Sequence, residues 1–321
     1  MISKKKISSF LIFLQVCTLF WLFACSSEDA IHSKIPMNWK PVDSLNVNLP
    51  QGIRLFAGRN DSLPINAWYV TIDEKNPYIY TEVFVSDDSS DNRETVSSFA
   101  KDLGARVVVN GGYFTMKQTP ALHYGLLMAE GKIISNATDS VIRDSFHYEV
   151  ARAAIGFSNE DDIDISWVTM RDGILYSWPL PPPNQPGNPA EPLDYSDAQI
   201  WKVHDAIGAG PGLVMDGKIH ITSDEEVFFG TAIPKIHPRT AAGYTEKGAL
   251  ILMVVDGRQD RSRGVSLNEL AMLMQELNVV EAMNLDGGGS TSLVVDNTLV
   301  NHPTSSLTER EVMSVIATFT K

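Results

Sequence analysis

The spacing of hydrophobic and polar residues changes several times along the chain, and each change marks an element. Alternating, aromatic-rich runs within residues 67–85 predict two strands. Apolar residues at helical spacing over 96–103 then predict a helix whose N-terminus is capped from the polar stretch SDDSSDN and which Gly104 ends. The apolar run VVVN, which ends at Asn110, predicts a buried strand that leads into GGYF.

The C-terminal third has the clearest pattern. The apolar run ALILMVV predicts a strand that ends at Asp256, and a capping box of Ser266 and Glu269 begins a helix. A second buried strand, VVEAMNL, ends at Asp286. A crossover through a helix makes the two strands parallel, so we expect both aspartates at the same edge of one sheet. Asn110 ends a similar helix and strand pair and is expected at a similar edge.

Two similar pairs of segments recur at one offset. GLLMAEGKI and GLVMDGKI begin at 125 and 212, RAAIGFS and RTAAGYT begin at 152 and 239, and both pairs are 87 residues apart. Each copy predicts a hairpin with an acidic-glycine turn, followed by a strand that begins with arginine. We therefore predict an α+β fold in which a mixed β-sheet core has flanking helices and contains an internal duplication of a hairpin-plus-strand unit. The proline-rich stretch 178–192 between the copies is either a lid over a site or an insertion without function.

The first residues follow a different pattern. Three lysines at positions 4–6, a long apolar run and the sequence LFAC predict a lipoprotein signal peptide over residues 1–24, with a plain secretory signal as the alternative. Cys25 is the predicted lipidation site. Residues 25–50 are predicted as a tether and 51–321 as the folded domain. These features predict a protein of the bacterial cell envelope, held at the outer membrane through its lipid only.

Charge narrows the choice of partner. The chain carries 39 acidic and 26 basic residues, a net charge of −13, which argues against nucleic acid as a partner. An anionic ligand therefore needs a local positive feature. Arg258 lies in the arginine-rich stretch GRQDRSRG, and Arg239 follows His237 in HPRTA. Arginine binds phosphate through two parallel hydrogen bonds, whereas pairing with surface carboxylates is the alternative use.

The stretch NLDGGGST, residues 284–291, combines a carboxylate, three glycines and two hydroxyls. Consecutive glycine N–H groups can form an anion-binding nest, and the alternative is a flexible hairpin entry. The sequence contains no GxxxxGK[ST], HExxH or GxSxG motif and no Cys/His cluster, so P-loop and zinc chemistry are not expected.

Five segments, in this order, carry a resemblance: NGGYF, GAGPGLV, HPRTAAGY, the block from VVDGR to GVSLNELA, and NLDGGGSTSLVV. Together they resemble the phosphodiester glycosidase family over roughly residues 65–320. The resemblance implies an α+β catalytic domain that hydrolyses a sugar-1-phosphate diester, with an N-acetylglucosamine-like sugar. Hydrolysis at an anomeric carbon uses a carboxylate as nucleophile or base, and the phosphate leaving group needs its charge neutralised.

Residue pattern and resemblance together predict the site. We expect Asp286 as nucleophile or general base, Asp256 as its partner, Arg239 and Arg258 on the phosphate, and Asn110 as a fifth catalytic residue that positions the ligand. The predicted substrate-binding residues are Gly111, Gly112, Tyr113, His237, Thr240, Asn284, Gly287, Gly288, Gly289, Ser290 and Thr291.

Three alternatives remain open from the sequence. The sequence establishes no cofactor, and a carboxylate holding Mg²⁺ or Ca²⁺ is a competing use of the same residues. The second alternative is a surface lipoprotein that binds glycans without turnover through exposed aromatic residues such as Trp178 or Trp201. A metal-dependent phosphodiesterase that cuts at phosphorus is the third possibility. The oligomeric state is not predicted.

Overall fold

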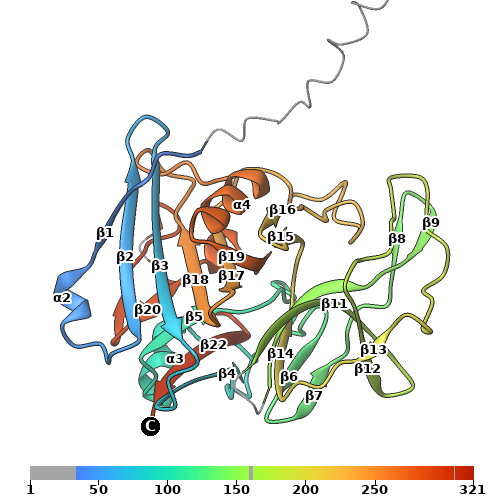
Figure 1. Cartoon of the computed structure of the whole chain (residues 1–321), viewed down its shortest axis with the longest axis horizontal. Helices are drawn as coiled ribbons and strands as arrows, with labels where there is room; N and C mark the ends of the chain where they lie inside the picture. Colours follow the sequence, from blue (N-terminus) through green and yellow to red (C-terminus); the bar gives the residue numbers. More distant parts are fainter. Residues whose placement is uncertain (1–33, 159–161, 307) are drawn as a thin grey trace, which may run out of the picture. The chain divides into compact units, whose positions relative to one another are not determined.

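β-Strands are the main secondary structure of the computed structural model, which describes residues 34–158, 162–306 and 308–321 (Figure 1). The predicted signal peptide and Cys25 lie outside the described residues. Within the described ranges, no helix is long and apolar enough to cross a membrane. Residues 34–321 form one compact unit.

Three sheets and one separate hairpin build the fold, and all neighbouring strands in them pair antiparallel. The eight-stranded sheet has the order β1 (Asn38–Pro41), β2 (Ile53–Asn60), β3 (Ile65–Asp73), β18 (Ala249–Val255), β17 (Arg239–Thr245), β19 (Val279–Asn284), β15 (Gly212–Met215), β16 (Lys218–Ile219). The seven-stranded sheet has the order β13 (Gln199–Ile200), β12 (Ile174–Trp178), β11 (Ile163–Arg171), β10 (Arg152–Phe157), β14 (Asp205–Gly208), β6 (Leu127–Ala129), β7 (Lys132–Ser135). The five-stranded sheet has the order β21 (Thr298–Leu299), β20 (Leu293–Val295), β5 (Val107–Asn110), β22 (Ser314–Thr320), β4 (Ile79–Val85), and the hairpin is β8 (Ser140–Arg143) with β9 (Phe146–Glu149).

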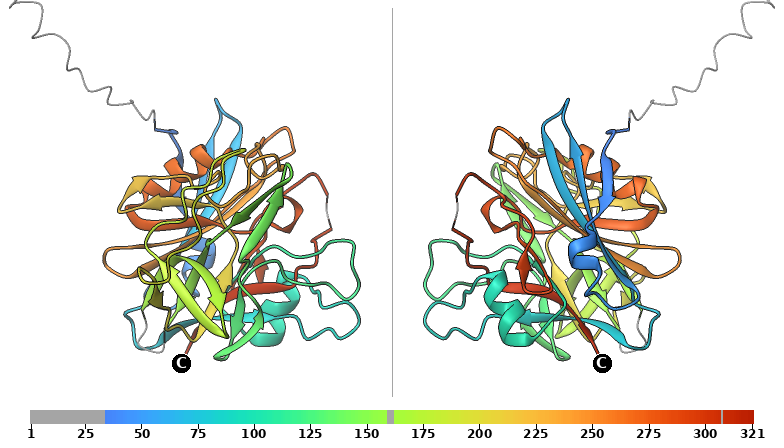
Figure 2. Two further views of the ribbon diagram at one scale, coloured as in Figure 1. Left: turned by 90° about the vertical axis from the view of Figure 1, so that its right-hand side faces the viewer. Right: turned by 90° about the vertical axis from the view of Figure 1, so that its left-hand side faces the viewer.

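Few helices accompany the sheets: α2 (Asp43–Asn46), α3 (Val96–Leu103), α4 (Leu267–Glu276) and the 3₁₀ turn η1 (Gly288–Ser290). The apolar face of α4 packs on one face of the eight-stranded sheet, and α3 packs on the five-stranded sheet beside β22 (Figure 2). The largest hydrophobic cluster lies between the sheets and takes residues from all three, such as Leu252, Ile155 and Ile316. The sheets therefore share one core.

Most predicted elements are confirmed. The helix that Gly104 ends is α3, with Gly104 in the left-handed conformation at φ 67°, and the predicted capping box of Ser266 and Glu269 begins α4. The predicted cap within SDDSSDN is wrong, because the Thr95 side chain accepts from the Ser98 N–H and so caps α3. Overall the structure is mostly β-sheet, so the predicted α+β class holds only as a sheet core with a few flanking helices.

The predicted tether extends too far. Residues 38–50 contain β1, which pairs with β2 at the edge of the eight-stranded sheet, and α2. Trp39 of β1 packs edge to face on Tyr69 of β3, with ring centroids 4.8 Å apart. This partly buried aromatic contact joins a segment with no clear periodicity to the sheet.

The two sheets that carry the repeated sequences have the same strand order. The series β11, β10, β14, β6, β7 corresponds to the series β18, β17, β19, β15, β16. The ladders also correspond: Ala154 pairs with Gly208, and Ala241, 87 residues after Ala154, pairs with Asn284. Both predicted acidic-glycine turns have positive φ at both residues, as a two-residue hairpin requires.

The strands before Asp256 and Asp286 run parallel, as predicted. Both β18 and β19 pair antiparallel with β17, which lies between them, so they point in the same direction. Their C-terminal ends, at Val255 and Asn284, therefore lie at one edge of the eight-stranded sheet. The end of β5 reaches the same region, because the Asp286 N–H donates to the Gly111 carbonyl at 3.0 Å.

Candidate active site

A pocket of about 180 Å³ lies at this edge of the eight-stranded sheet. The structure brings many of the predicted site residues to its lining. Its lining residues are Tyr113, Ala232, Ile233, His237, Arg239, Arg258, Asn284, Asp286, Gly287, Gly288, Gly289 and Arg310. The lining thus combines one carboxylate with three guanidinium groups.

Asp286 is held firmly at the end of β19. Its N–H donates to the Gly111 carbonyl, and the Asn110 amide Nδ2 donates to its carbonyl at 2.7 Å. Its Oδ1 accepts the N–H of Gly287 at 2.8 Å. Burial raises the pKa of the Asp286 carboxyl to about 6, a shift that Gly287 and the charge of Arg310 partly oppose. The carboxyl therefore ionises near neutral pH.

Asn110 supports Asp286 from behind the pocket. It is fully buried, and its Oδ1 accepts the Thr240 hydroxyl at 2.7 Å and the Ser292 N–H at 3.2 Å. With its amide on the Asp286 carbonyl, all three contacts join separate segments of the chain. Asn110 and Thr240 therefore act as positioning residues for Asp286 and do not line the pocket.

Asn284 and Tyr113 form a second buried network beside the carboxylate. The Asn284 Nδ2 donates to the Tyr113 hydroxyl oxygen at 2.9 Å and to the Gly210 carbonyl at 3.0 Å. The Tyr113 hydroxyl donates to the same carbonyl at 2.7 Å. Burial raises the pKa of Tyr113, so its hydroxyl stays protonated. The motif GAGPG thus supplies an acceptor for the pocket wall.

Arg258 reaches the pocket from the turn after β18. Its Nη2 donates to Nδ1 of His237 at 3.0 Å, while Nε2 of His237 lies 2.9 Å from the Ala232 carbonyl and must carry the proton there. Burial, followed by the charges of nearby cations, lowers the pKa of His237 and keeps it neutral. Gly288, at φ 66°, has no side chain in the way: a Cβ there would lie 3.1 Å from the Arg258 Nη2. The glycine lets the guanidinium approach the backbone.

Arg310 is the pocket residue that sequence reasoning missed. It lies in the polar stretch SSLTER, which has no periodicity or motif to mark it. A Cβ at Gly289 would lie 2.4 Å from the Arg310 Cζ. The missing side chain at Gly289 therefore also leaves room for a guanidinium group. In the described part of the chain Arg310 makes no hydrogen bond or ion pair within contact distance, and its charge acts on Asp286. Its donors are available for an anion.

Arg239 uses its donors differently. It is buried at the start of β17, and it donates to the carbonyls of Val265, Ile233 and Lys235 and, at 3.5 Å, to Oδ1 of Asn284. Burial lowers its pKa to about 10, so it remains charged at neutral pH. Arg239 therefore organises the loop that forms one wall of the pocket, and it offers less to a ligand than Arg258 does.

Asp256 does not line the pocket with Asp286. Its buried Oδ1 accepts from Asn301 Nδ2 at 3.0 Å, and the same Nδ2 donates to the Thr291 carbonyl at 3.0 Å. Burial raises the pKa of Asp256 to about 6, against the opposing effect of Asn301. Asp256 thus supports the glycine-rich loop through Asn301, because the turn after β18 directs its side chain away from the pocket.

The predicted anion nest of three free N–H groups is not formed. Gly287 donates to the Asp286 side chain and Gly288 donates to the Pro238 carbonyl at 2.9 Å, so both are used within the protein. The glycines serve instead to admit the two guanidinium groups. The predicted site residues that the structure leaves outside the pocket lining are Asn110, Gly111, Gly112, Thr240, Asp256, Ser290 and Thr291.

The chain matches a known protein family over most of its length. The sequence profile described as phosphodiester glycosidase matches residues 103–319. The chain belongs to the phosphodiester glycosidase family. It is 29% identical over 224 residues to the N-acetylglucosamine-1-phosphodiester alpha-N-acetylglucosaminidase of Bos taurus and 28% identical over 220 residues to that of Homo sapiens. These matches cover 67% and 66% of this chain but only 36% of each relative.

Solved structures share the phosphodiester glycosidase fold. The catalytic domain of the zebrafish enzyme of the same name, auto-inhibited by its pro-peptide, superimposes with a TM-score of 0.59 at 22% identity and covers 89% of both chains. A hypothetical protein from Synechocystis gives a TM-score of 0.60 at 19% identity, with 90% of this chain and 64% of that chain covered. At these identities the likeness shows the fold alone.

The charges that line the pocket bear on the expected Mg²⁺ or Ca²⁺. Among the described residues, no group of three or more His, Cys, Asp or Glu side chains comes together in a way that could hold a metal ion by itself. Three guanidinium groups and one carboxylate line the pocket, and that balance favours an anion. Mg²⁺ or Ca²⁺ stays a prediction that these residues do not favour.

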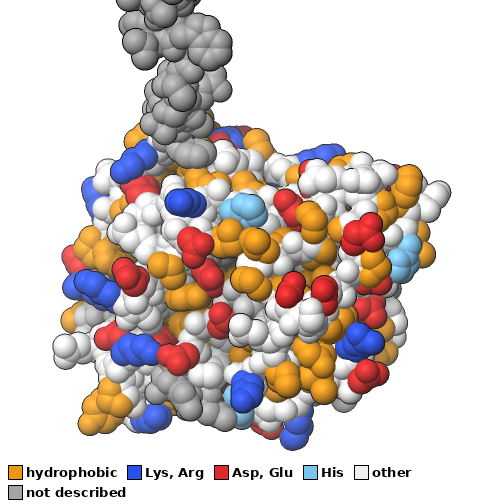
Figure 3. Space-filling model, turned by 45° about the vertical axis from the view of Figure 1, so that its right-hand side comes forward, with side chains coloured by type: hydrophobic (Ala, Val, Ile, Leu, Met, Phe, Trp, Pro, Cys, Tyr) orange, Lys and Arg blue, Asp and Glu red, His pale blue; other side chains and the backbone are white. Residues whose placement is uncertain are grey.

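The two tryptophans that a non-catalytic glycan binder was expected to expose do not have the predicted exposure. Trp178 and Trp201 are buried, at 7% and 9% exposure, so neither is an exposed platform. The proline-rich loop lines no part of the candidate active site; Asn184 instead ties it to the Glu149 and Glu225 carbonyls. On the face shown in Figure 3, basic side chains stand singly among acidic ones and do not gather into a continuous patch.

Proposed function

We propose that the protein hydrolyses the bond between a sugar and phosphate in a sugar-1-phosphodiester. The observation that carries the proposal is the pocket in which Asp286 stands among Arg258, Arg310 and Arg239. The matched relatives are named for N-acetylglucosamine-1-phosphodiester, which supports an N-acetylglucosamine-like sugar. The match covers only 36% of each of those relatives, so we propose their substrate for this chain on similarity alone.

The chemistry needs one carboxylate and a positive site. Asp286, ionised above pH about 6, attacks the anomeric carbon or takes a proton from the water that attacks it. The bond between the anomeric carbon and the bridging oxygen breaks, and its electron pair leaves with the phosphate monoester. Arg258 and Arg310 neutralise the phosphate, which is a good leaving group without a strong general acid. Water completes the free sugar.

The decisive experiment determines which product receives the oxygen atom of the attacking water. The domain from residue 34 is incubated with a panel of sugar-1-phosphodiesters in ¹⁸O-labelled water, with and without EDTA. We expect free reducing sugar that carries the label and a phosphate monoester that does not, with no effect of EDTA. Label in phosphate would mean cleavage at phosphorus, and EDTA sensitivity would assign a metal. If no diester is cleaved, the non-catalytic glycan-binding alternative replaces the proposal.

We propose further that the protein is an envelope lipoprotein anchored at the outer membrane. The support is the basic, apolar and LFAC pattern that ends at Cys25, within residues that the structure does not describe. Labelled palmitate should enter the wild-type protein, and Cys25→Ser should release it in soluble form. An unlabelled wild-type protein would remove the lipid anchor.

We also infer that the eight-stranded and seven-stranded sheets derive from a duplicated hairpin-plus-strand unit. Two facts support this inference: the shared 87-residue offset of the sequence pairs and the shared strand order described above. A profile built from one half alone should detect the other half in related chains at the same register. A best match at another register would contradict duplication.

A further inference from the structure

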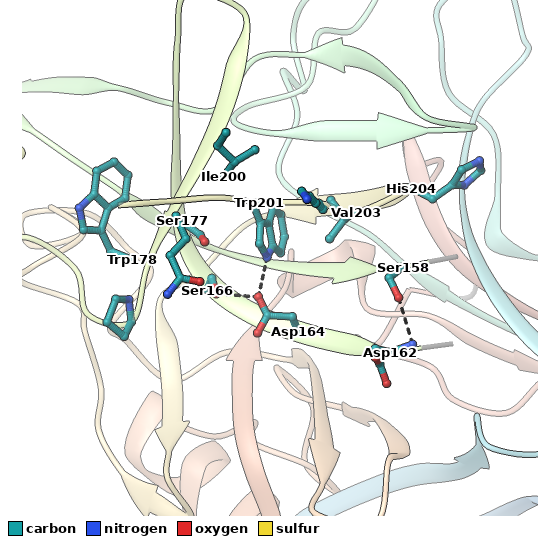
Figure 4. Close-up of a pocket in the computed structure, with 13 residues that line it drawn as sticks. Ser158, Asp162, Asp164, Ser166, Ser177, Trp178, Ile200, Trp201, Val203 and His204 are labelled. Carbon is teal, nitrogen blue, oxygen red and sulfur yellow. Dashed lines mark hydrogen bonds between the residues drawn. The ribbon is translucent and has the colours of Figure 1, made fainter. Parts of the chain in front are cut away.

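A second, larger cavity lies on the seven-stranded sheet (Figure 4). Its volume is about 680 Å³, within the range of roughly 300–1,000 Å³ that holds small ligands. Side chains from β11, from β12 and from the segment that joins β13 to β14 line it, and none of them lines the candidate active site. The cavity is therefore separate from the proposed catalytic pocket.

The carboxylate of Asp164 in this cavity is held in place, and only one of its two oxygens accepts hydrogen bonds from the described residues. Oδ2 of Asp164 accepts both the Ser166 hydroxyl, at 2.6 Å, and the indole N–H of Trp201, which points at the carboxylate in Figure 4. Its Oδ1 receives no hydrogen bond from a residue that the structure describes. An acceptor in a fixed position selects a ligand that brings hydrogen-bond donors, such as a hydroxyl group.

The remaining lining mixes apolar surface with neutral polar groups. Ile200, at the rim, is 59% exposed, and the rings of Trp178 and Trp201 border the cavity. Ser177 and Gln199 add a hydroxyl and an amide. Apolar patches beside donors and acceptors match the C–H faces and hydroxyl groups of a sugar ring, whereas a purely apolar ligand would leave the Asp164 carboxylate without partners.

The charges argue against an anionic ligand. Asp162 and Asp164 face a single lysine, Lys202, around the cavity, and the carboxylate of Asp205 lies 3.1 Å from Nδ1 of His204. Among the residues that the structure describes around this cavity, none carries a guanidinium group. A phosphate here would meet carboxylate repulsion without the arginines that the other pocket provides.

We propose that this cavity binds a neutral saccharide, and that it does so independently of the catalytic pocket. Asp164 and the polar groups beside it accept the sugar hydroxyls, and the exposed side chain of Ile200 contacts the C–H faces. The proposal stands whether or not the protein hydrolyses phosphodiesters. It gives the protein a means to hold a glycan at a site other than the one that would cleave it.

Isothermal titration and saturation-transfer NMR test the proposal with maltose, cellobiose and N,N′-diacetylchitobiose, and with glucose 1-phosphate as the anionic probe. At least one neutral disaccharide should bind. Asp164→Asn should weaken that binding about tenfold or more, since a charge-assisted acceptor is lost. Ile200→Ser, at an exposed position that the fold does not need, should cause a smaller loss. Asp172→Asn, at the tip of the β11–β12 hairpin, is the matched control and should leave the affinity unchanged.

Several outcomes overturn the assignment. The cavity is not a neutral-saccharide site if none of the three disaccharides binds, or if only glucose 1-phosphate binds. Binding that survives both Asp164→Asn and Ile200→Ser but disappears in Arg310→Ala would place the saccharide in the catalytic pocket instead. Thermal unfolding of each variant shows that it is folded, and Ile200→Ser keeps the test valid if Asp164→Asn unfolds.

Discussion

The two sheets with the same strand order end in different chemistry. Arg152 begins β10 as Arg239 begins β17, but Gly208 stands where the other sheet has Asn284, and Gly210 stands two residues on where the other has Asp286. The cavity beside Arg152 and Gly208 measures about 10 Å³, room for about one water molecule. Sheets with the same strand order thus have a candidate active site at these strand ends in the eight-stranded sheet and closely packed side chains at the corresponding ends in the seven-stranded sheet.

The arginines show that the same residue type can either pack within the fold or line a pocket. Arg152 is half-buried, its Nε donates to the Glu226 carbonyl at 3.1 Å, and its Cζ lies 4.3 Å from the centroid of the Phe228 ring. Arg258 and Arg310 reach their pocket because glycines leave them room. The comparison teaches that a few side chains at strand ends, and the glycines beside them, decide which end can bind an anion.

The largest expected effect is at the residue that the seven-stranded sheet lacks. Asp286→Asn keeps the shape of the side chain and removes its charge, so kcat/KM for a cleaved sugar-1-phosphodiester should fall about 10²–10⁴-fold. Asp216→Asn, in the exposed β15–β16 turn, is the matched control and should retain full activity. Near-UV circular dichroism reports that both variants are folded. An active Asp286→Asn variant would remove this residue from the mechanism.

The arginine pair gives the next largest contrast. Arg310→Ala should lower kcat/KM about 10–100-fold, as loss of a charge-assisted hydrogen bond of about 1.5–3 kcal/mol predicts. Arg152→Ala should leave the activity of folded molecules unchanged but lower the free energy of unfolding by about 1–3 kcal/mol, because the Glu226 carbonyl and the Phe228 ring lose their partner. Steady-state kinetics and urea denaturation measure the two effects. The reverse pattern would contradict the division of roles.

The pH profile separates the two aspartates. If the ionised Asp286 acts, kcat/KM should fall about tenfold for each pH unit below its pKa of about 6. Asp256 has a similarly raised pKa but lies behind the pocket, so Asp256→Asn should keep this acidic limb. A limb that disappears in Asp256→Asn would give that residue the catalytic proton.

The same raised pKa values affect stability with a definite sign. Between pH 3.8, the ordinary pKa of an aspartate, and about pH 6, the folded protein binds protons at Asp256 and Asp286 that the unfolded chain has lost. The contribution of these groups to stability is therefore present below about pH 4 and is lost as pH rises through 6. Denaturation at several pH values should show a flatter dependence over this window in Asp256→Asn than in the wild type.

The smallest expected effect tests the glycines. A methyl group at Gly289 would displace the flexible end of Arg310, so Gly289→Ala should reduce kcat/KM by less than Arg310→Ala does. In an Arg310→Ala background the same change should have no further effect, since the clash is gone. Full additivity of the two changes would mean that Gly289 acts in some other way.

Local sequence patterns predicted what depends on local structure. The capping box of α4, the acidic-glycine turns and the apolar strand before Asp286 are all encoded within a few residues, and the crossover rule then placed β18 and β19 parallel. Arg310 was missed because it reaches the pocket only through tertiary packing of an aperiodic stretch. Asp256 was misplaced because strand direction fixes the sheet edge but not the direction of a side chain in the turn that follows.

The position of β22 has a consequence for how the chain is made. It joins β4 to β5, with Val315 beside Asn110, although more than 200 residues separate β5 from β22 in the sequence. During synthesis, the edges of β4 and β5 that pair with β22 therefore remain unpaired until almost the whole chain has been translated. Such open edges recruit strands from other chains, and long-range pairings form slowly. Yield of folded protein should then depend on growth temperature and chaperone supply, and fragments that stop before residue 314 should aggregate.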